Sequence, residues 1–93
     1  MQWTEEQLKQ IEELAALAFS VKKLAIILGV DEAELRHAIS DETGDVFKRY
    51  QRGRLLSESE WRKSVFTLAK QGSSPAQTLA KKLSDECEME NLR

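Results

Sequence analysis

The stretch from Phe19 to Ile39 constrains the fold of this 93-residue chain more than any other. Two short segments with the apolar periodicity of amphipathic helices flank Gly29 within it. Ser20 precedes the first segment and Asp31 precedes the second, and both residue types are favoured helix N-caps. Glycine adopts a positive φ at little cost, so Gly29 is suited to end one helix and turn directly into the next. The stretch therefore predicts two helices joined by a tight turn.

A helix, a glycine-containing turn and a second helix form the layout of a helix-turn-helix, whose second helix can enter the major groove of DNA. The same layout also serves only for packing in many small helical domains, and that interpretation stays open. A further helix is predicted upstream, where Thr4 and Gln7 have the spacing of a capping box. Together these patterns predict a trihelical helix-turn-helix domain over residues 1–44.

The second half of the chain contains few residues that end helices. Residues 46–71 hold no proline and a single glycine, Gly53, and their apolar residues recur at helical spacing. They predict either one long helix or two helices bent near Gly53. A helix of that length would extend about 39 Å, longer than a trihelical bundle is wide. Gly72 is predicted to end it. Ser74 is then predicted to cap a helix that begins at Pro75 and folds back as a hairpin.

The predicted fold class is all-α, with the trihelical domain followed by a long helix and a helical hairpin. Residues 1–44 are predicted to bind DNA, and residues 45–93 to drive oligomerisation and to end in an acidic tail. A chain of this size buries a modest core, so oligomerisation is a common way to gain stability. The predicted oligomer interface consists of Tyr50, Trp61, Val65, Phe66, Leu68, Leu79 and Leu83.

Charge is distributed unevenly along the chain, although the net charge is only −2. Residues 1–44 hold four Lys or Arg against nine Asp or Glu, whereas residues 45–72 hold seven against three. The strongest basic cluster is formed by Lys48, Arg49, Arg52 and Arg54. One interpretation is attraction of DNA phosphates, which is independent of sequence and weakened by salt. The other is a solvated helix face paired with acidic residues of the first domain or of a neighbouring subunit.

Four more residues are predicted to contact DNA from the helix-turn-helix itself. Arg36 and His37 are expected to face outward on its second helix, where Arg36 could pair with guanine edges and His37 with a base or phosphate. Lys22 and Lys23 begin its first helix, where proteins of this type often contact phosphate. All four residues are equally compatible with an ordinary solvated surface.

The chain shows no pattern typical of catalysis. His37 and Cys87 have no partners at metal-ligand or catalytic spacing, and no glycine-rich loop is present to hold phosphate. We therefore predict a protein that is not an enzyme and that needs no cofactor or metal. The single cysteine implies no oxidising compartment, and no apolar run approaches membrane-spanning length. The N-terminus lacks a signal-peptide pattern, so we expect a cytoplasmic protein without a membrane partner.

The sequence DVFKRYQRGRLLSESEWRKSVFTLAKQGSSPAQTLAKKL, which begins at Asp45, resembles the second half of the small terminase subunits of tailed bacteriophages. The motifs that carry the resemblance are an aromatic-x-x-Gly-basic stretch at 50–54, Ala-Lys-x-Gly at 69–72 and a Leu-Lys-rich helix end at 79–83. In that family a helix-turn-helix precedes the hairpin. The resemblance covers about Trp3 to Leu83.

The resemblance implies a non-enzymatic subunit that recognises viral DNA, assembles through its hairpin, often as a ring, and regulates the large motor subunit. The implied partners are double-stranded DNA, further copies of the chain and the large terminase subunit, in the host bacterial cytoplasm. This chain departs from the family in having few DNA-reading residues on its second helix-turn-helix helix and a short tail after Leu83. Two alternatives remain: a helix-turn-helix transcriptional regulator of phage or bacterial origin, and an acidic protein–protein adaptor.

Overall fold

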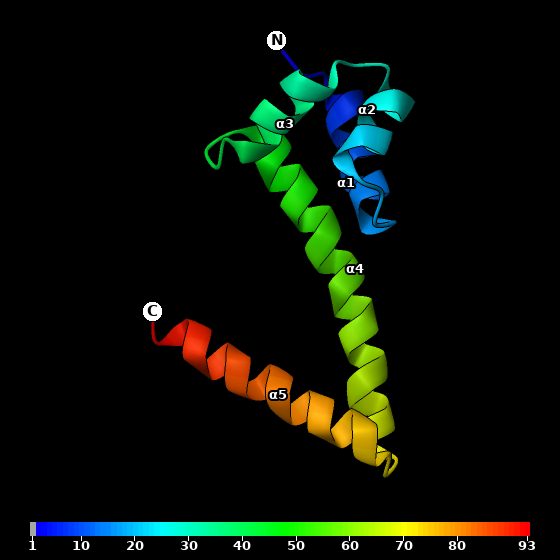
Figure 1. Ribbon diagram of the computed structural model, residues 1–93, viewed down its shortest axis with the longest axis vertical. Coiled ribbons are helices and arrows are strands. Elements are labelled where there is room, and N and C mark those ends of the chain that lie inside the picture. Colours follow the sequence, from blue (N-terminus) through cyan, green and yellow to red (C-terminus); the bar gives the residue numbers. More distant parts are fainter. Residues whose placement is uncertain (1) are drawn as a thin grey trace. The chain divides into compact units, whose positions relative to one another are not determined.

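The computed structural model describes residues 2–93, which form five α-helices and, within that range, no strand (Figure 1). The all-α prediction is confirmed. In chain order the helices are α1 (Glu5–Ala16), α2 (Val21–Leu28), α3 (Glu32–Ser40), α4 (Asp45–Lys70) and α5 (Ser74–Asn91). The chain divides into two compact units, Met1–Glu58 (unit 1) and Ser59–Arg93 (unit 2), and α4 contributes to both.

The first three helices begin at the caps that the sequence predicts. The Thr4 hydroxyl accepts a hydrogen bond from the Gln7 amide at 3.1 Å, and the Gln7 side chain accepts one from the Thr4 amide at 3.0 Å. Ser20 and Asp31 each accept a hydrogen bond from the backbone amide three residues on, at 3.3 and 3.1 Å. These bonds satisfy amides that have no partner within their own helices, and they fix where each helix starts.

Gly29 makes the turn between α2 and α3. Its φ is +71°, in the left-handed region, and its amide bonds back to carbonyls of the last turn of α2. The next amide, of Val30, donates to the Ala25 carbonyl at 3.0 Å. This arrangement satisfies carbonyls that α2 leaves open and reverses the chain within a few residues, as the position of the glycine predicts.

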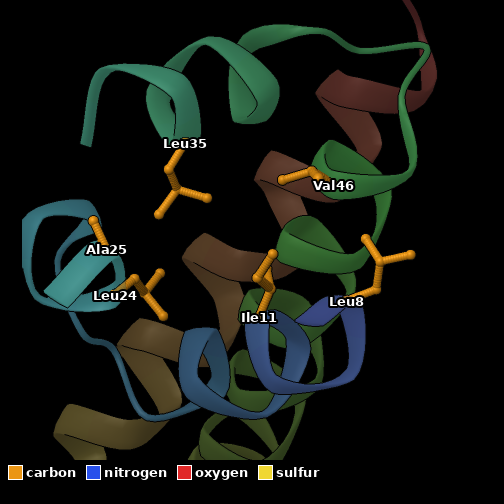
Figure 2. Close-up of a cluster of buried hydrophobic side chains, with 6 residues drawn as sticks. All are labelled: Leu8, Ile11, Leu24, Ala25, Leu35 and Val46. Carbon is orange, nitrogen blue, oxygen red and sulfur yellow. The ribbon is translucent and has the colours of Figure 1, made fainter. Parts of the chain in front are cut away.

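Unit 1 is built around one core to which four helices contribute (Figure 2). Its buried residues are Leu8 and Ile11 of α1, Leu24 and Ala25 of α2, Leu35 of α3 and Val46 of α4. Three of these side chains, on three different helices, have no exposed surface. Full burial of one such side chain stabilises a fold by roughly 1.5–3 kcal/mol. The short helices α1–α3 therefore depend on each other, and on the start of α4, for their stability.

The crossing of α1 and α4 in unit 1 depends on Gly53. This residue is buried, and a methyl group at its Cα would lie 2.2 Å from the backbone oxygen of Glu12 and 3.1 Å from Cβ of Ala15. Only glycine therefore permits this approach. The helix continues through Gly53, so the chain forms the single long helix and not the bent pair. The first part of α4, residues 45–58, thus belongs to unit 1. The assignment of DNA binding to residues 1–44 and of oligomerisation to residues 45–93 stays a prediction.

Unit 2 is a helical hairpin formed by the end of α4 and α5. Its core consists of the buried residues Val65, Ala80 and Leu83, with Ala69 and Leu79 partly buried against them. The turn contains Gly72, whose φ is +99°. The predicted cap is wrong by one residue, because Ser73 and not Ser74 accepts the hydrogen bond that caps α5, from the amide of Ala76 at 3.4 Å.

Candidate nucleic-acid interface and assembly surfaces

The polar residues predicted to contact DNA from α2 and α3 are all exposed. Leu35 is fully buried in the core, so its neighbours Arg36 and His37 face solvent. Lys22 and Lys23 are exposed in the first turn of α2. The structure thus leaves these four side chains accessible on one pair of helices, which the Gly29 turn joins.

Arg36 has one partner on its own helix. Its Nε lies 3.1 Å from Oε2 of Glu32, one turn earlier, and the two side chains are 58% and 42% exposed. Exposed pairs of this spacing contribute only about 0.3–0.5 kcal/mol. Exchange of Glu32 for a phosphate or a guanine edge would therefore cost little.

One face of α3 borders an acidic cavity. This cavity of about 530 Å³ between the N-terminal segment, α3 and the start of α4 is lined by Trp3, Glu34, His37, Asp41 and Asp45, among others. Glu34, Asp41 and Asp45 share this cavity with His37, and their negative charges disfavour phosphate there. The accessible cations of α2 and α3 are thus bordered by an acidic surface.

Asp41 is held in its charged form at this acidic border. The Thr43 hydroxyl donates a hydrogen bond to Oδ1 of Asp41 at 2.8 Å, and the Thr43 amide donates one to the same oxygen at 3.2 Å. These two bonds lower the pKa of Asp41 from its ordinary value of 3.8, and the nearby His37 lowers it further. A negative charge therefore persists beside α3 down to low pH.

The basic cluster of α4 is largely occupied by α1. The guanidinium of Arg49 pairs with Glu5, and its Nη1 lies 3.6 Å from Oε1 of Glu12. Arg52 Nε lies 3.2 Å from the same oxygen of Glu12. The interpretation in which this cluster pairs with acids of the first domain therefore describes Arg49 and Arg52.

The other two members of the cluster differ. Arg54 donates a hydrogen bond from Nη1 to the carbonyl of Ala15 at 3.4 Å, close to the C-terminal end of α1, where a cation is favourable. Lys48 is exposed and forms no ion pair with any residue of the part of the chain described. The role of the four cations in DNA binding stays a prediction, and the acids of α1 reduce the positive charge that they offer.

Glu12 is the centre of this charge cluster. Its Oε1 is shielded from solvent, yet neither guanidinium meets it with hydrogen-bond geometry. The attraction is therefore mainly Coulombic, and the partly buried position makes it stronger than a pair in bulk water. The cluster ties α1 to α4 beside the close approach at Gly53.

The residues predicted for self-association fall into two groups. Tyr50 packs against the core of unit 1, whereas Val65, Leu79 and Leu83 pack inside the hairpin of unit 2. Trp61, Phe66 and Leu68 remain 56%, 36% and 50% exposed. Of the predicted interface residues, Trp61, Phe66 and Leu68 therefore present apolar surface that a partner chain could cover.

Among residues 2–93, seven large apolar residues outside the predicted interface are also exposed: Leu17, Ile26, Ile27, Leu55, Leu56, Met89 and Leu92. Leu55 and Leu56 lie on α4 and are 58% and 48% exposed, and Met89 and Leu92 lie at the end of α5 and are 59% and 82% exposed. The sequence signal that could have found Leu55 is Gly53 itself. A glycine that faces α1 places Leu55, two residues later, on the far side of α4.

Comparison of this chain with protein-family models, with curated proteins and with solved structures found no match. Within residues 2–93, no group of three or more His, Cys, Asp and Glu side chains is placed to hold a metal ion. No helix of the same range combines the length and the apolar character that a bilayer crossing needs.

Proposed function

We propose that this chain is a non-enzymatic, self-associating DNA-binding subunit of a phage genome-packaging complex, similar to a small terminase subunit. The observation that carries the DNA-binding part is the exposure of Lys22, Lys23, Arg36 and His37 on the two helices joined at Gly29. The packaging part rests on the resemblance of residues 45–83 to that family. Double-stranded DNA, further copies of the chain and the large terminase subunit are the partners, in the cytoplasm of the host bacterium.

In this proposal α3 approaches the major groove and α2 contacts the backbone. Arg36 exchanges Glu32 for a guanine edge, and His37 contacts a base or a phosphate. Lys22 and Lys23 neutralise phosphates beside the groove. With about three phosphates neutralised, the logarithm of the binding constant falls with that of the salt concentration with a slope of about −3. A single chain therefore binds weakly and with little sequence preference.

Self-association compensates for this weak contact. Several copies that contact one duplex bind far more tightly than one copy, because the second contact is intramolecular. The exposed Trp61, Phe66 and Leu68 of unit 2 supply apolar surface for such an assembly. An assembly of this kind holds DNA for a motor subunit without any chemistry of its own.

The test is binding of fluorescently labelled duplex DNA, measured by anisotropy at two salt concentrations. Charge reversal in Lys22→Glu with Arg36→Glu is expected to weaken binding by more than tenfold, because two cations of the interface become anions. Lys70→Glu with Lys82→Glu is a matched control, since it makes the same change of net charge at two exposed sites of unit 2. Equal binding of the two variants would refute the assignment of the interface to α2 and α3.

The acidic adaptor is the second candidate, and the acidic cavity beside α3 together with the pairing of Arg49 and Arg52 with α1 favours it. Absence of DNA binding even at low salt would select the adaptor. A dimer that prefers palindromic DNA would instead select the transcriptional regulator, because two-fold symmetry matches paired half-sites.

A further inference from the structure

The face of α4 in unit 1 carries a groove of about 510 Å³. It is lined by Phe47, Lys48, Gln51, Arg52, Leu55 and Leu56. Both leucines are about half exposed, and Phe47 is half-buried. Lys48 and Arg52 are exposed among these residues, and because Arg52 already pairs with Glu12 of α1, Lys48 supplies the unpaired positive charge of the groove.

The end of α5 has the complementary composition. Asp85, Glu86, Glu88 and Glu90 bring four negative charges within six residues, and one of them, Asp85, pairs with Lys81 one turn earlier at 3.7 Å. Met89 and Leu92, three residues apart, share one face of the helix and are 59% and 82% exposed. Met89 follows the core residue Ala80 by nine residues, which is about two and a half helical turns. It therefore lies on the side of α5 opposite to the hairpin core.

We propose that the end of α5 of one copy docks in the α4 groove of a second copy. Met89 and Leu92 fill the groove against Phe47, Leu55 and Leu56, while the acidic residues face Lys48. Apolar burial supplies the affinity, and the opposite charges set the orientation of the docked helix. This inference rests on the self-association in the proposed function, and it assigns the contact to surfaces other than the exposed Trp61, Phe66 and Leu68.

A contact of this kind joins two different surfaces. Every copy carries one groove and one α5 end, so each copy can receive one neighbour and dock on another. Such a heterologous contact forms a ring if the rotation between neighbours closes, and an open filament if it does not. None of Lys22, Lys23, Arg36 and His37 lines the groove, so the docked α5 end does not occupy the residues that we assign to DNA contact.

The test uses the full chain and two double variants. Met89→Ser with Leu92→Ser removes the apolar residues of the α5 end, and Leu55→Ser with Leu56→Ser removes those of the groove. All four residues are exposed, so neither unit loses a core residue. Analytical ultracentrifugation is expected to show at least a tenfold weaker association for each variant. Ile26→Ser, at a residue 71% exposed on α2, is the control and is expected to assemble like the unchanged chain.

Mixing the two variants tests the pairing directly. The α5-end variant keeps an intact groove and the groove variant keeps an intact α5 end. An equimolar mixture is therefore expected to form one-to-one dimers, while each variant stays monomeric by itself. A second test reverses the charges of the contact. Lys48→Glu is expected to weaken association, and mixing this variant with a chain that carries Glu88→Lys is expected to restore it.

Unchanged mass in both double variants, a monomeric unchanged chain, or a mixture without dimers would each overturn the docking proposal. Loss of assembly in Trp61→Ser with full assembly in the two double variants would also overturn it, and would place the interface on the hairpin. Failure of the DNA-binding proposal is distinguishable from failure of the docking proposal. The variant Lys22→Glu with Arg36→Glu is expected to change the anisotropy of labelled DNA and to leave the mass of the assembly unchanged. The docking contact and the DNA contact are thus tested by separate measurements.

Discussion

The backbone of Gly53 lies directly against the backbone carbonyl of Glu12, so close that a methyl group at its Cα would come within 2.2 Å of that oxygen. The same Glu12 holds the guanidinium groups of Arg49 and Arg52 with its side chain. One residue of α1 therefore contacts α4 through both its backbone and its carboxylate. The position of α1 on α4 depends on this double contact.

Gly53→Ala is expected to destabilise the protein although alanine is the better helix former. Helix propensity favours alanine by about 1 kcal/mol, while overpacking against a backbone atom costs about 1–3 kcal/mol or more. We expect the free energy of unfolding in urea to fall by about 2 kcal/mol. Gln51→Ala, at an exposed site of the same helix, should change it by less than about 0.5 kcal/mol. An increase in stability of Gly53→Ala would show that α1 does not approach α4 this closely.

Ala18→Gly is expected to stabilise unit 1. Ala18 follows α1 with a φ of +64°, a left-handed conformation that costs a residue with a Cβ atom about 1–2 kcal/mol. Glycine removes that cost but loses more entropy on folding, so a net gain of up to about 1 kcal/mol is expected. Ala16→Gly, inside the last turn of α1, should have the opposite sign. Thermal unfolding of the two variants measures this difference.

The Glu12–Arg49 pair is expected to couple by about 1 kcal/mol, the upper end for exposed pairs, because both side chains are partly buried. A double-mutant cycle with Glu12→Gln and Arg49→Gln measures the coupling through urea unfolding. Added salt should reduce it. The exposed pair of Glu60 and Lys63 is the control and should couple by less than about 0.5 kcal/mol. Equal coupling in the two pairs would mean that the burial of Glu12 has no effect.

Thr43→Val is expected to raise the pKa of Asp41 toward its ordinary value of 3.8, because the hydroxyl bond is the largest cause of the lowered value. In the folded chain the lowered pKa favours the carboxylate. The resulting stability is present above pH 3.8 and is lost as the pH falls through the lowered folded value. An NMR titration of the Asp41 carboxyl carbon measures the shift. Thr67→Val, whose hydroxyl donates to a backbone carbonyl, should leave that titration unchanged.

Features set by neighbouring residues were predictable from the sequence. The capping bonds of Thr4, Ser20 and Asp31 and the left-handed turn at Gly29 all involve residues within a few positions of each other. The start of α5 was misassigned because two adjacent serines both suit a cap, and only the backbone conformation selects Ser73. The left-handed Ala18 gives no sequence signal, since the residue type usual at that position is glycine.

Features set by packing between distant segments were not predictable. Pairing with acids of the first domain was one of two interpretations of the α4 cations. Only the approach of α1 at Gly53 brings Glu12 to Arg49 and Arg52, some forty residues away. The groove beside Leu55 was missed for the same reason, because the direction of that side chain depends on which face of α4 meets α1.

The small core of unit 2 makes the detachment of α5 less costly in free energy than the opening of unit 1. Val65, Ala80 and Leu83 are its buried residues outside the turn region, and each keeps 8% of its surface exposed. Little apolar surface is exposed again when α5 detaches, so this opening costs less than opening unit 1 with its fully buried side chains. Backbone amides of α5 are therefore expected to exchange with deuterated solvent while those of α1–α3 stay protected. A partner held by α5 would slow that exchange and so reveal itself in the hydrogen-exchange pattern of this helix.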